Sequence, residues 1–351
     1  MSPETNDGRA PLASVVIPTY GTPDTLARAV LSALGQEDAR VEVIVVDDND
    51  PASAGRRATE AVMGRFSAEG RMRYLRHEAN RGGSCARNTG AQVARGRYLC
   101  FLDDDDVMLP GRVRACADAL EAAPRSPIAL CDVVHRYAPE AANYYAMDAG
   151  ALTPEGVFSM RALIGTGSNL FVPRWAYDRV GGFDVDFVRH QDLEFAVRVL
   201  SLGPAAVVAR PLIVKATNAT NNVPAYDRMR EVKRLYHERL SFVLDAMESR
   251  ARASYLCACH LELFRGALLT GTLAQARAEL AQAGTYGPVP KAKAWAQLAA
   301  KALGLYALRL RRRGTATIVS NGTEWLVAAH PEALACLERL DRLAREGAVR
   351  P

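Results

Sequence analysis

The sequence has little that would anchor the chain in a membrane or link it by disulfides. No stretch approaches the roughly 18 uninterrupted apolar residues of a membrane-spanning helix. The polar start, MSPETNDGRAPLA, lacks the apolar segment of a secretory signal. The seven cysteines form an odd and scattered set, which suits reduced thiols better than a disulfide framework. We therefore expect a cytoplasmic protein.

Other absences narrow the range of functions. Aromatic residues make up only 7% of the chain and basic residues are spread out, which argues against nucleic-acid binding. The glycine-rich segment 80–90 follows neither the GxGxxG nor the GxxxxGK[ST] pattern, so we expect no dinucleotide fingerprint and no P-loop. Cys257, Cys259 and His260 lie in an apolar helical run without a second cluster, and we interpret them as core residues rather than a zinc site.

Strand and helix signals alternate along the N-terminal part of the chain. Apolar and β-branched runs predict strands at 14–18, 41–46, 71–76, 97–102, 128–135, 169–172 and 206–214. Helical spacing predicts helices at 24–34, 58–66, 84–94, 107–122, 174–180 and 192–202. This alternation predicts an α/β fold with a Rossmann-like, mostly parallel sheet flanked by helices.

The composition also divides the chain. Residues 1–12 are expected to form a flexible N-terminus, and residues 13–225 an α/β domain with halves 13–106 and 107–225. After that, Ala, Leu and Arg recur at helical periodicity, which predicts a C-terminal helical region over 226–351.

Three unusual loops follow predicted strands. They are Pro18–Tyr20, Asp47–Asp50 and Asp103–Asp106. Parallel sheets bind ligands at the carboxyl ends of their strands, so the three loops predict one binding site at that edge.

The run Asp103–Asp106 carries the clearest chemistry. Four adjacent carboxylates repel one another unless a cation neutralises them. Their oxygens suit a hard ion such as Mg²⁺ or Mn²⁺, which keeps open positions for phosphate oxygens. Successive residues of an extended chain point to opposite faces, so Asp103 and Asp105 can project together. The alternative is a solvated acidic turn.

Three further side chains are candidates for binding or catalysis. Asp48 can accept hydrogen bonds from a base or a ribose, or it can form an Asx-turn. Arg87, in the glycine-rich segment, can face a diphosphate, or it can be a solvated side chain near a helix start. Asp192 precedes an apolar helix and can act as a general base or as an N-cap.

Six ordered motifs between residues 13 and 215 resemble glycosyltransferase family 2, with its GT-A fold. They are SVVIPTY at 14–20, VVDD at 45–48, NRGGSCARNTG at 80–90, FLDDDD at 101–106, VGGFD at 180–184 and HQD at 190–192. Three positions depart from the usual pattern: Asp104 replaces a small residue, Gln191 replaces a glutamate, and Asn49-Asp50-Pro51 follows the second motif.

The resemblance assigns a role to each motif. It implies a nucleotide-binding half, 13–106, with residues Pro18, Thr19, Tyr20, Asp48, Arg87, Asp103 and Asp104 on the nucleotide. Asp105 would ligate Mn²⁺ or Mg²⁺, and Asp192 would be the catalytic base. An acceptor half, 107–225, would place these residues beside the sugar and the acceptor: Gly167, Ser168, Asn169, Gly182, Phe183, Asp184 and Gln191.

The implied activity is inverting transfer of a sugar. The donor would be a nucleotide-diphosphate sugar, with UDP favoured by the family pattern, and the acceptor a hydroxyl of a glycan or lipid-linked molecule in surface polysaccharide, lipopolysaccharide or capsule biosynthesis. A sugar nucleotidyltransferase would need a glycine- and arginine-rich signature that 18–24 lacks. A non-catalytic nucleotide-sugar-binding or scaffold protein would lack Asp192.

The basic segment 291–313 leaves two interpretations open. Its apolar residues Trp295, Leu298, Leu305 and Leu308 recur at helical spacing, and it ends in an arginine cluster. This pattern fits a peripheral helix on the inner face of the cell membrane. It also fits a helix packed on the rest of the protein, and a homodimer is a further option.

Overall fold

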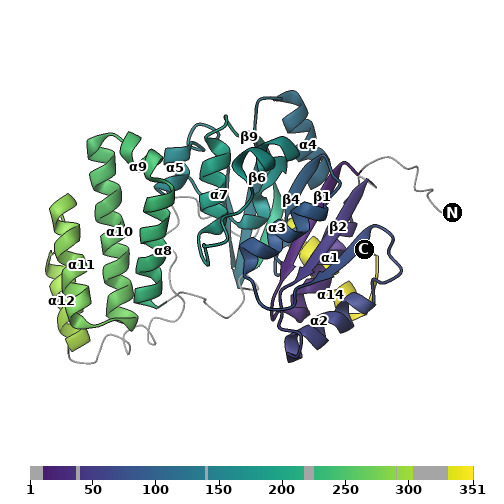
Figure 1. The fold of residues 1–351 in the computed structure, drawn as a ribbon, viewed down its shortest axis with the longest axis horizontal. Helices are drawn as coiled ribbons and strands as arrows, with labels where there is room; N and C mark the ends of the chain where they lie inside the picture. The colour runs from purple at the N-terminus through teal and green to yellow at the C-terminus, as the bar shows by residue number, and fades with distance from the viewer. Residues whose placement is uncertain are drawn as a thin grey trace. The chain divides into compact units, whose positions relative to one another are not determined.

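The structure of the protein, a computed structural model, describes residues 11–36, 40–138, 141–216, 225–289, 291–302 and 331–350 (Figure 1). The chain forms two compact units. The described residues of the first unit are those up to 216 together with 331–350, and those of the second are 225–302. The expected flexible segment 1–12 lies mostly outside the described residues.

The first unit begins with four strands joined by helices. The elements are β1 (Ala13–Thr19), α1 (Pro23–Leu34), β2 (Val41–Asp47), α2 (Ala54–Gly64), β3 (Met72–Arg76), α3 (Gly83–Val93) and β4 (Tyr98–Phe101). Every residue of β1 and β2 is buried, as expected for nearly continuous apolar strands covered on both faces. Proline starts α1 and the Ser53 side chain caps α2. The alternation predicted from the sequence is confirmed here.

The rest of this unit is more irregular. Its elements are β5 (Val107–Met108), α4 (Arg112–Ala122), β6 (Ala129–Ala138), β7 (Ala141–Tyr145), α5 (Pro154–Phe158), η1 (Gly167–Asn169), β8 (Phe171–Pro173), α6 (Arg174–Val180), α7 (Gln191–Leu200) and β9 (Ala206–Ala216). The strands described in this unit form one sheet with the order β3-β2-β1-β4-β8-β6-β9-β5, and β7 pairs with β6. The pairs among β1 to β4 are parallel, as is β6 with β9, whereas β8, β5 and β7 run antiparallel to their neighbours. The expected α/β sheet flanked by helices is confirmed.

Two expected elements were wrong in detail. The segment 107–122 was expected to be one helix, but Val107 and Met108 pair with β9, and the helix begins only at Arg112. Pro110 and the left-handed Gly111, with φ of 78°, separate the two. The segment 169–172 was expected to be a strand, but it begins inside a 3₁₀ turn. The short elements β7 and α5 were not expected.

The described elements of the second unit are all helical. They are α8 (Tyr226–Arg239), α9 (Ser241–Ala246), α10 (Ser249–Thr270), α11 (Leu273–Tyr286) and α12 (Lys291–Ala302). Its core contains Tyr226, Leu263, Phe264 and Leu298. Among the described helices, none combines the length and the apolar character needed to cross a membrane.

The segment 291–313 is described only in part. It is helical to Ala302, where Leu298 is buried and Trp295 is exposed. Part of its apolar stripe therefore packs inside the helical unit. Leu305, Leu308 and the arginine cluster lie outside the described residues, so its contact with a membrane stays a prediction.

The last helix, α14 (Pro331–Arg345), belongs to the first unit (Figure 1). Its buried residues Ala333, Leu337 and Leu340 belong to the core of the first unit, and the helix contacts α1. This arrangement differs from the single helical region expected over 226–351. The chain therefore contributes first to the unit with the sheet, then to the helical unit, and then again to the unit with the sheet.

Candidate functional site

The loops that follow β1, β2 and β4 touch one another. The main-chain N–H of Gly21 donates to Asn49 at 3.0 Å, and that of Asp48 donates to the carbonyl of Thr19 at 2.9 Å. The Thr22 hydroxyl donates to the Asp104 carboxylate. The parallel pairing of these strands brings their carboxyl ends to one edge. The predicted meeting of the three loops is confirmed.

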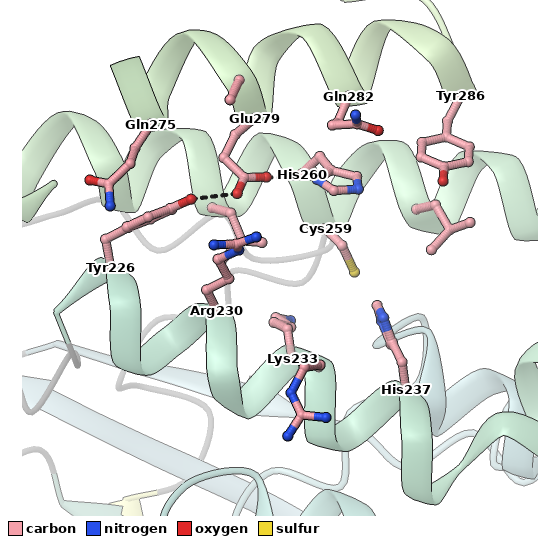
Figure 2. Close-up of a pocket in the computed structure, with 14 residues that line it drawn as sticks. Tyr226, Arg230, Lys233, His237, Cys259, His260, Gln275, Glu279, Gln282 and Tyr286 are labelled. Atoms are coloured by element: carbon pink, nitrogen blue, oxygen red, sulfur yellow. Dashed lines mark hydrogen bonds and ion pairs between the residues drawn. The ribbon is translucent and has the colours of Figure 1, made fainter. Parts of the chain in front are cut away.

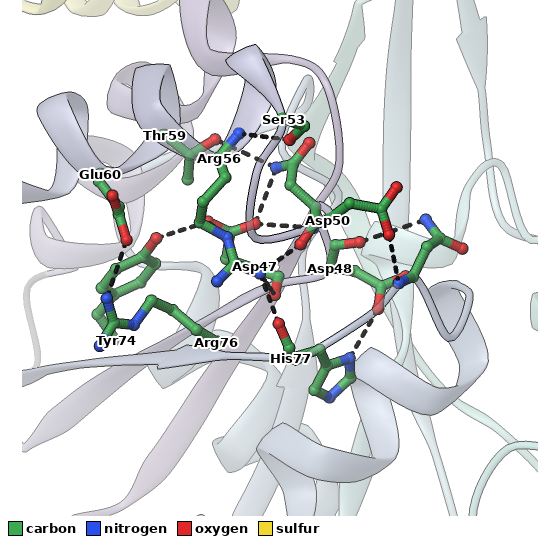
Figure 3. A network of polar contacts seen from close by, with 12 residues as sticks. Asp47, Asp48, Asp50, Ser53, Arg56, Thr59, Glu60, Tyr74, Arg76 and His77 are labelled. Atoms are coloured by element: carbon green, nitrogen blue, oxygen red, sulfur yellow. Dashed lines mark hydrogen bonds and ion pairs between the residues drawn. The ribbon is translucent and has the colours of Figure 1, made fainter.

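Asp47 holds the loop after β2 in place (Figure 3). Its carboxylate is fully buried and accepts hydrogen bonds from the main chain and side chain of Asn49 at 2.9 and 2.8 Å. The Tyr74 hydroxyl donates to it at 2.5 Å, and Arg56 forms an ion pair with it at 3.1 Å. These contacts hold the loop after β2 to α2 and β3, which gives Asp47 a structural role.

Asp48 fastens the start of the glycine-rich segment. Its carboxylate accepts from the main-chain N–H groups of Arg81 and Gly82 at 2.8 and 2.7 Å, and contacts His77 Nδ1 at 2.7 Å (Figure 3). The other His77 nitrogen lies 2.9 Å from the Thr89 hydroxyl. Asp48 therefore links β2 to the loop that precedes α3. Its contact with a nucleoside stays a prediction.

Arg87 reaches from α3 to the other loops of the site. Its guanidinium donates to Asp103 at 2.5 Å and lies over the Phe183 ring, 5.6 Å from its centroid. The Gln191 amide, oriented to satisfy both of its ends, accepts from Arg87 at 2.8 Å and donates to the carbonyl of Phe187 at 3.3 Å. Arg87 thus joins the aspartate run to the start of α7.

Gly167 marks the point where the candidate residues meet. A Cβ atom placed on it would lie 3.4 Å from Asp192 Cβ, 3.6 Å from an Asp103 carboxylate oxygen and 3.8 Å from an Arg87 guanidinium nitrogen. These residues come from η1, α7, the loop after β4, and α3. Glycine leaves this space open, and two aspartates and an arginine border it.

Asp192 does not cap its helix. It is the second residue of α7, and the N-cap is His190, in a left-handed conformation with φ of 62°. Glu194, two residues further on, is buried and forms an ion pair with Arg198 at 2.5 Å, so Glu194 is structural. The helix start presents Asp192, and not Glu194, to the space beside Gly167.

The aspartate run carries unfavourable negative charge. Burial, reinforced by the charge of Asp103, raises the pKa of Asp104 to about 6. Burial and the charges of Asp103 and Asp104 raise the pKa of Asp105 to about 7. Burial and the charges of Asp105 and Asp103 raise the pKa of Asp106 to about 7. A cation at this loop would offset the repulsion.

The aspartates of this run alone do not complete the coordination of a metal ion. In the part of the chain that the structure describes, no three His, Cys, Asp or Glu side chains are grouped to hold a metal ion. A divalent ion here would need oxygens from a bound phosphate and from water besides the aspartates. Mg²⁺ commonly binds in this way, through one or two carboxylates and substrate phosphates.

Several predicted site residues have mainly structural contacts. The Ser168 hydroxyl donates to Asp106 at 2.6 Å, and the Asn169 amide donates to the carbonyls of Cys131 and Ile164 at 2.7 and 2.9 Å. Both Ser168 and Asn169 are fully buried. They shape the turn that presents Gly167, so the structure places them behind the site.

The VGGFD motif likewise packs against its surroundings. A Cβ atom on Gly182 would come within 2.7 Å of the Tyr177 hydroxyl, which explains the glycine. Phe183 is buried and stacks on Phe195 with 4.2 Å between ring centroids. Asp184 accepts a hydrogen bond from the main chain two residues on, at 3.0 Å. In the first loop, Pro18 and Thr19 are buried and Tyr20 is exposed.

One structural residue of the site was missed. Arg112, at the start of α4, is completely buried and donates to Cys100 Sγ at 2.6 Å and to the Ser168 carbonyl at 2.7 Å. It supports the turn that carries Gly167. Nothing in its local sequence distinguishes it from an exposed helical arginine.

Comparisons with known proteins agree with this geometry. The model of "Glycosyl transferase family 2" matches residues 14–169, and that of "Glycosyl transferase family group 2" matches 98–318, more than half of the chain. The succinoglycan biosynthesis protein ExoO of Rhizobium meliloti (strain 1021) is 40% identical over 123 residues. This match covers 35% of the chain but only 33% of ExoO.

Solved structures show the same fold. S. aureus TarS 1–349 in complex with UDP-GlcNAc has a TM-score of 0.59 at 16% identity, covering 96% of this chain and 92% of that one. The mannosyltransferase PcManGT from Pyrobaculum calidifontis, in complex with GDP-Man and Mn²⁺, has a TM-score of 0.50 at 18% identity, covering 96% and 88%. The protein has a GT-A fold and belongs to glycosyltransferase family 2.

Proposed function

We propose that the protein is an inverting glycosyltransferase that moves a sugar from a UDP-sugar to a hydroxyl of a glycan or lipid-linked acceptor in surface polysaccharide biosynthesis. The observation that carries this proposal is the meeting of Asp103, Arg87 and Asp192 around Gly167. Two relatives support the choice of substrates, since TarS was solved with UDP-GlcNAc and ExoO is named for succinoglycan biosynthesis.

The donor would lie across the edge where the three loops meet. Pro18, Thr19 and Tyr20 would contact the nucleoside together with Asp48, whose carboxylate accepts hydrogen bonds from the main chain of Arg81 and Gly82. Asp103 and Asp104 would face the ribose. Arg87, held by Asp103 and Gln191, would face the diphosphate as a bidentate donor.

Asp105 would hold Mn²⁺ or Mg²⁺ together with diphosphate oxygens. When bound, the ion supplies positive charge that stabilises the leaving diphosphate. The raised pKa values of Asp104, Asp105 and Asp106 support a cation here, because a cation would offset the repulsion among these buried carboxylates. PcManGT, of the same fold, was solved with Mn²⁺.

The reaction would be one in-line displacement. The Asp192 carboxylate would take the proton of the acceptor hydroxyl, and that oxygen would form a bond to the anomeric carbon of the sugar. The bond from this carbon to the diphosphate would break on the opposite side, and the nucleoside diphosphate would leave with the electron pair. Arg87 would offset its growing charge. A single displacement inverts the anomeric configuration.

Calorimetric titration of UDP tests the donor site. We expect UDP to bind the wild-type protein with Mn²⁺ and to bind much more weakly without it. Asp105→Ala should lower the affinity in Mn²⁺ by about tenfold or more, because loss of even an indirect metal partner has a cost of that order. Asp118→Ala is the matched control, since Asp118 is an exposed carboxylate on α4.

The outcomes separate the parts of the proposal. Binding of GDP in place of UDP would keep the enzyme class and change the donor. Binding that is equal with and without Mn²⁺ would contradict the metal role of Asp105. No binding of any nucleoside diphosphate would overturn the proposed transferase.

A further inference from the structure

The helical unit contains a cavity that is not part of the proposed donor site. It has a volume of about 540 Å³ and lies between α8, α10 and α11, within residues 226–286 (Figure 2). Every residue that lines it belongs to this unit. The cavity can therefore be considered without reference to the sheet.

One wall of the cavity is a polar face of α8. Tyr226, Arg230, Lys233 and His237 recur at intervals of four, three and four, which places them on one side of the helix. Figure 2 shows Arg230, Lys233 and His237 extending from α8 toward α10 and α11. A helix normally turns aliphatic side chains toward its neighbours. Cationic side chains that extend from α8 toward neighbouring helices are therefore unusual.

The charged side chain of Lys233 is almost fully buried. Its side chain is 5% exposed, and it forms an ion pair with Glu262 of α10 at 2.8 Å. Burying an ammonium group is costly even with a partner, and the partner here is itself half exposed. A helix pair that needed only to pack would be served equally well by apolar residues.

The opposite wall holds the acidic side chain that lines the cavity, Glu279 of α11. It is buried, accepts from the Tyr226 hydroxyl at 2.6 Å and contacts His260 Nδ1 at 2.7 Å. His260 also stacks on Tyr286, with 5.7 Å between ring centroids. Each oxygen of Glu279 therefore already has one contact within the helical unit.

The remaining cations are not matched by acids inside the cavity. Arg234 pairs with Glu231 and Glu238 on the exposed side of its own helix. Arg230 makes no ion pair within the described residues, although it lines the cavity. Burial, with the positive charges of Lys233 and His260, lowers the pKa of His237 to about 4. Arg230 is therefore the cation of the cavity that has no acidic partner among the described residues.

We infer that this cavity binds an anionic group, a phosphate or a carboxylate carried by a sugar-sized ligand, with Arg230 and Lys233 as its main partners. The volume admits a sugar-sized group, and Tyr226 and Tyr286 supply aromatic surface and hydroxyl groups beside the cations. Because the charges line a concave space, they suit a single inserted group better than a flat lipid surface.

Side-chain NMR of the histidines tests this inference on the full chain. The protein has only six histidines, and His237 and His260 line the cavity whereas His77 lies in the donor site. We expect inorganic phosphate or glucuronate to shift the signals of His237 and His260 in a saturable way, and glucose to leave them unchanged. A bound anion should also raise the pKa of His237, because it offsets the charge of Lys233.

Two variants of α8 give the matched comparison. Arg230→Gln should weaken the anion response by about tenfold, the effect expected from losing one hydrogen bond to a charged group. Arg228→Gln removes the same charge from an exposed residue of the same helix that does not line the cavity, and should leave the response unchanged. The melting temperatures of both variants should match the wild type, since both arginines are exposed.

The outcomes decide the inference. A response to phosphate or to glucuronate that depends on Arg230 supports it, and the tighter of the two identifies the anion. No saturable shift with either anion would overturn it. Equal responses in Arg230→Gln and Arg228→Gln would overturn it as well. None of these results depends on UDP binding, so this inference and the proposed transferase can fail separately.

Discussion

Within the part of the chain that the structure describes, the Asp192 side chain differs from the Asp103, Asp106 and Glu194 side chains in having no partner. Asp103 is held by Arg87, Asp106 by Thr166 and Ser168, and Glu194 by Arg198. Among the described residues, none forms a hydrogen bond or an ion pair with the Asp192 carboxylate. A general base must be able to take a proton from a bound substrate, so this freedom favours Asp192 for the role.

Replacing Asp192 by its amide tests that role. Asp192→Asn keeps the size of the side chain and removes its ability to accept a proton. Turnover, measured as UDP release from a UDP-sugar, should fall by about 100-fold or more, the usual contribution of a general base. The affinity for UDP should not change. Asp178→Asn, on the exposed side of α6, is the control. Equal turnover in the two variants would rule out Asp192 as the base.

The residues that support the site were harder to predict than those that border it. The motifs of the sequence predicted Asp103, Arg87 and Asp192, because the resemblance to glycosyltransferase family 2 gives each of these positions a role. Arg112 gave no such signal. Its partners, Cys100 and Ser168, come from other parts of the chain, and a buried arginine without a carboxylate partner is unusual.

At the scale of elements, α14 connects the end of the described chain to the candidate site. Ala333, Leu337, Leu340 and Ala344 repeat at intervals of four, three and four and lie in the core of the first unit. Arg28 of α1 donates to Asp341 of α14 at 2.7 Å and to the main-chain carbonyl of Asp105 at 2.6 Å. Arg28 therefore links α14 to the main chain of the aspartate run.

Removing a core side chain of α14 should weaken the first unit. Leu337 is completely buried, so Leu337→Ala should lower the free energy of unfolding by about 2–5 kcal/mol, as buried leucines usually do. Glu338→Ala, on the exposed side of the same helix, should cost little. Urea denaturation measures both. A loss below 1 kcal/mol for Leu337→Ala would contradict the packing of α14 described above.

The packing of α14 in the first unit could not be predicted from the sequence pattern. Helical periodicity predicts only a helical region over 226–351, and the pattern of an apolar stripe does not say which surface it covers. The same holds for Val107 and Met108, which look helical locally and yet pair with Ile213 and Val214, about a hundred residues later. The first two strands were predictable because each is a nearly continuous apolar run, as expected for a strand buried on both faces.

On the scale of the whole molecule, the chain combines two units with separate cores. The first core gathers residues of the sheet, α1, α4 and α14, and the second gathers residues of α8, α10, α11 and α12. The proposed donor site belongs to the first unit and the proposed anion cavity to the second. Two cores with two ligands predict two distinguishable unfolding transitions.

Calorimetric unfolding with each ligand tests this division. A ligand that binds only the folded state stabilises the unit that holds its site, by about 2.7 kcal/mol at 100 times its dissociation constant. UDP with Mn²⁺ should therefore raise one transition and phosphate the other. Leu337→Ala should lower the transition that responds to UDP. Leu263→Ala, in the core of the helical unit, should lower the transition that responds to phosphate. A single transition that every ligand and variant shifts together would show that the two units unfold as one, and would contradict the prediction.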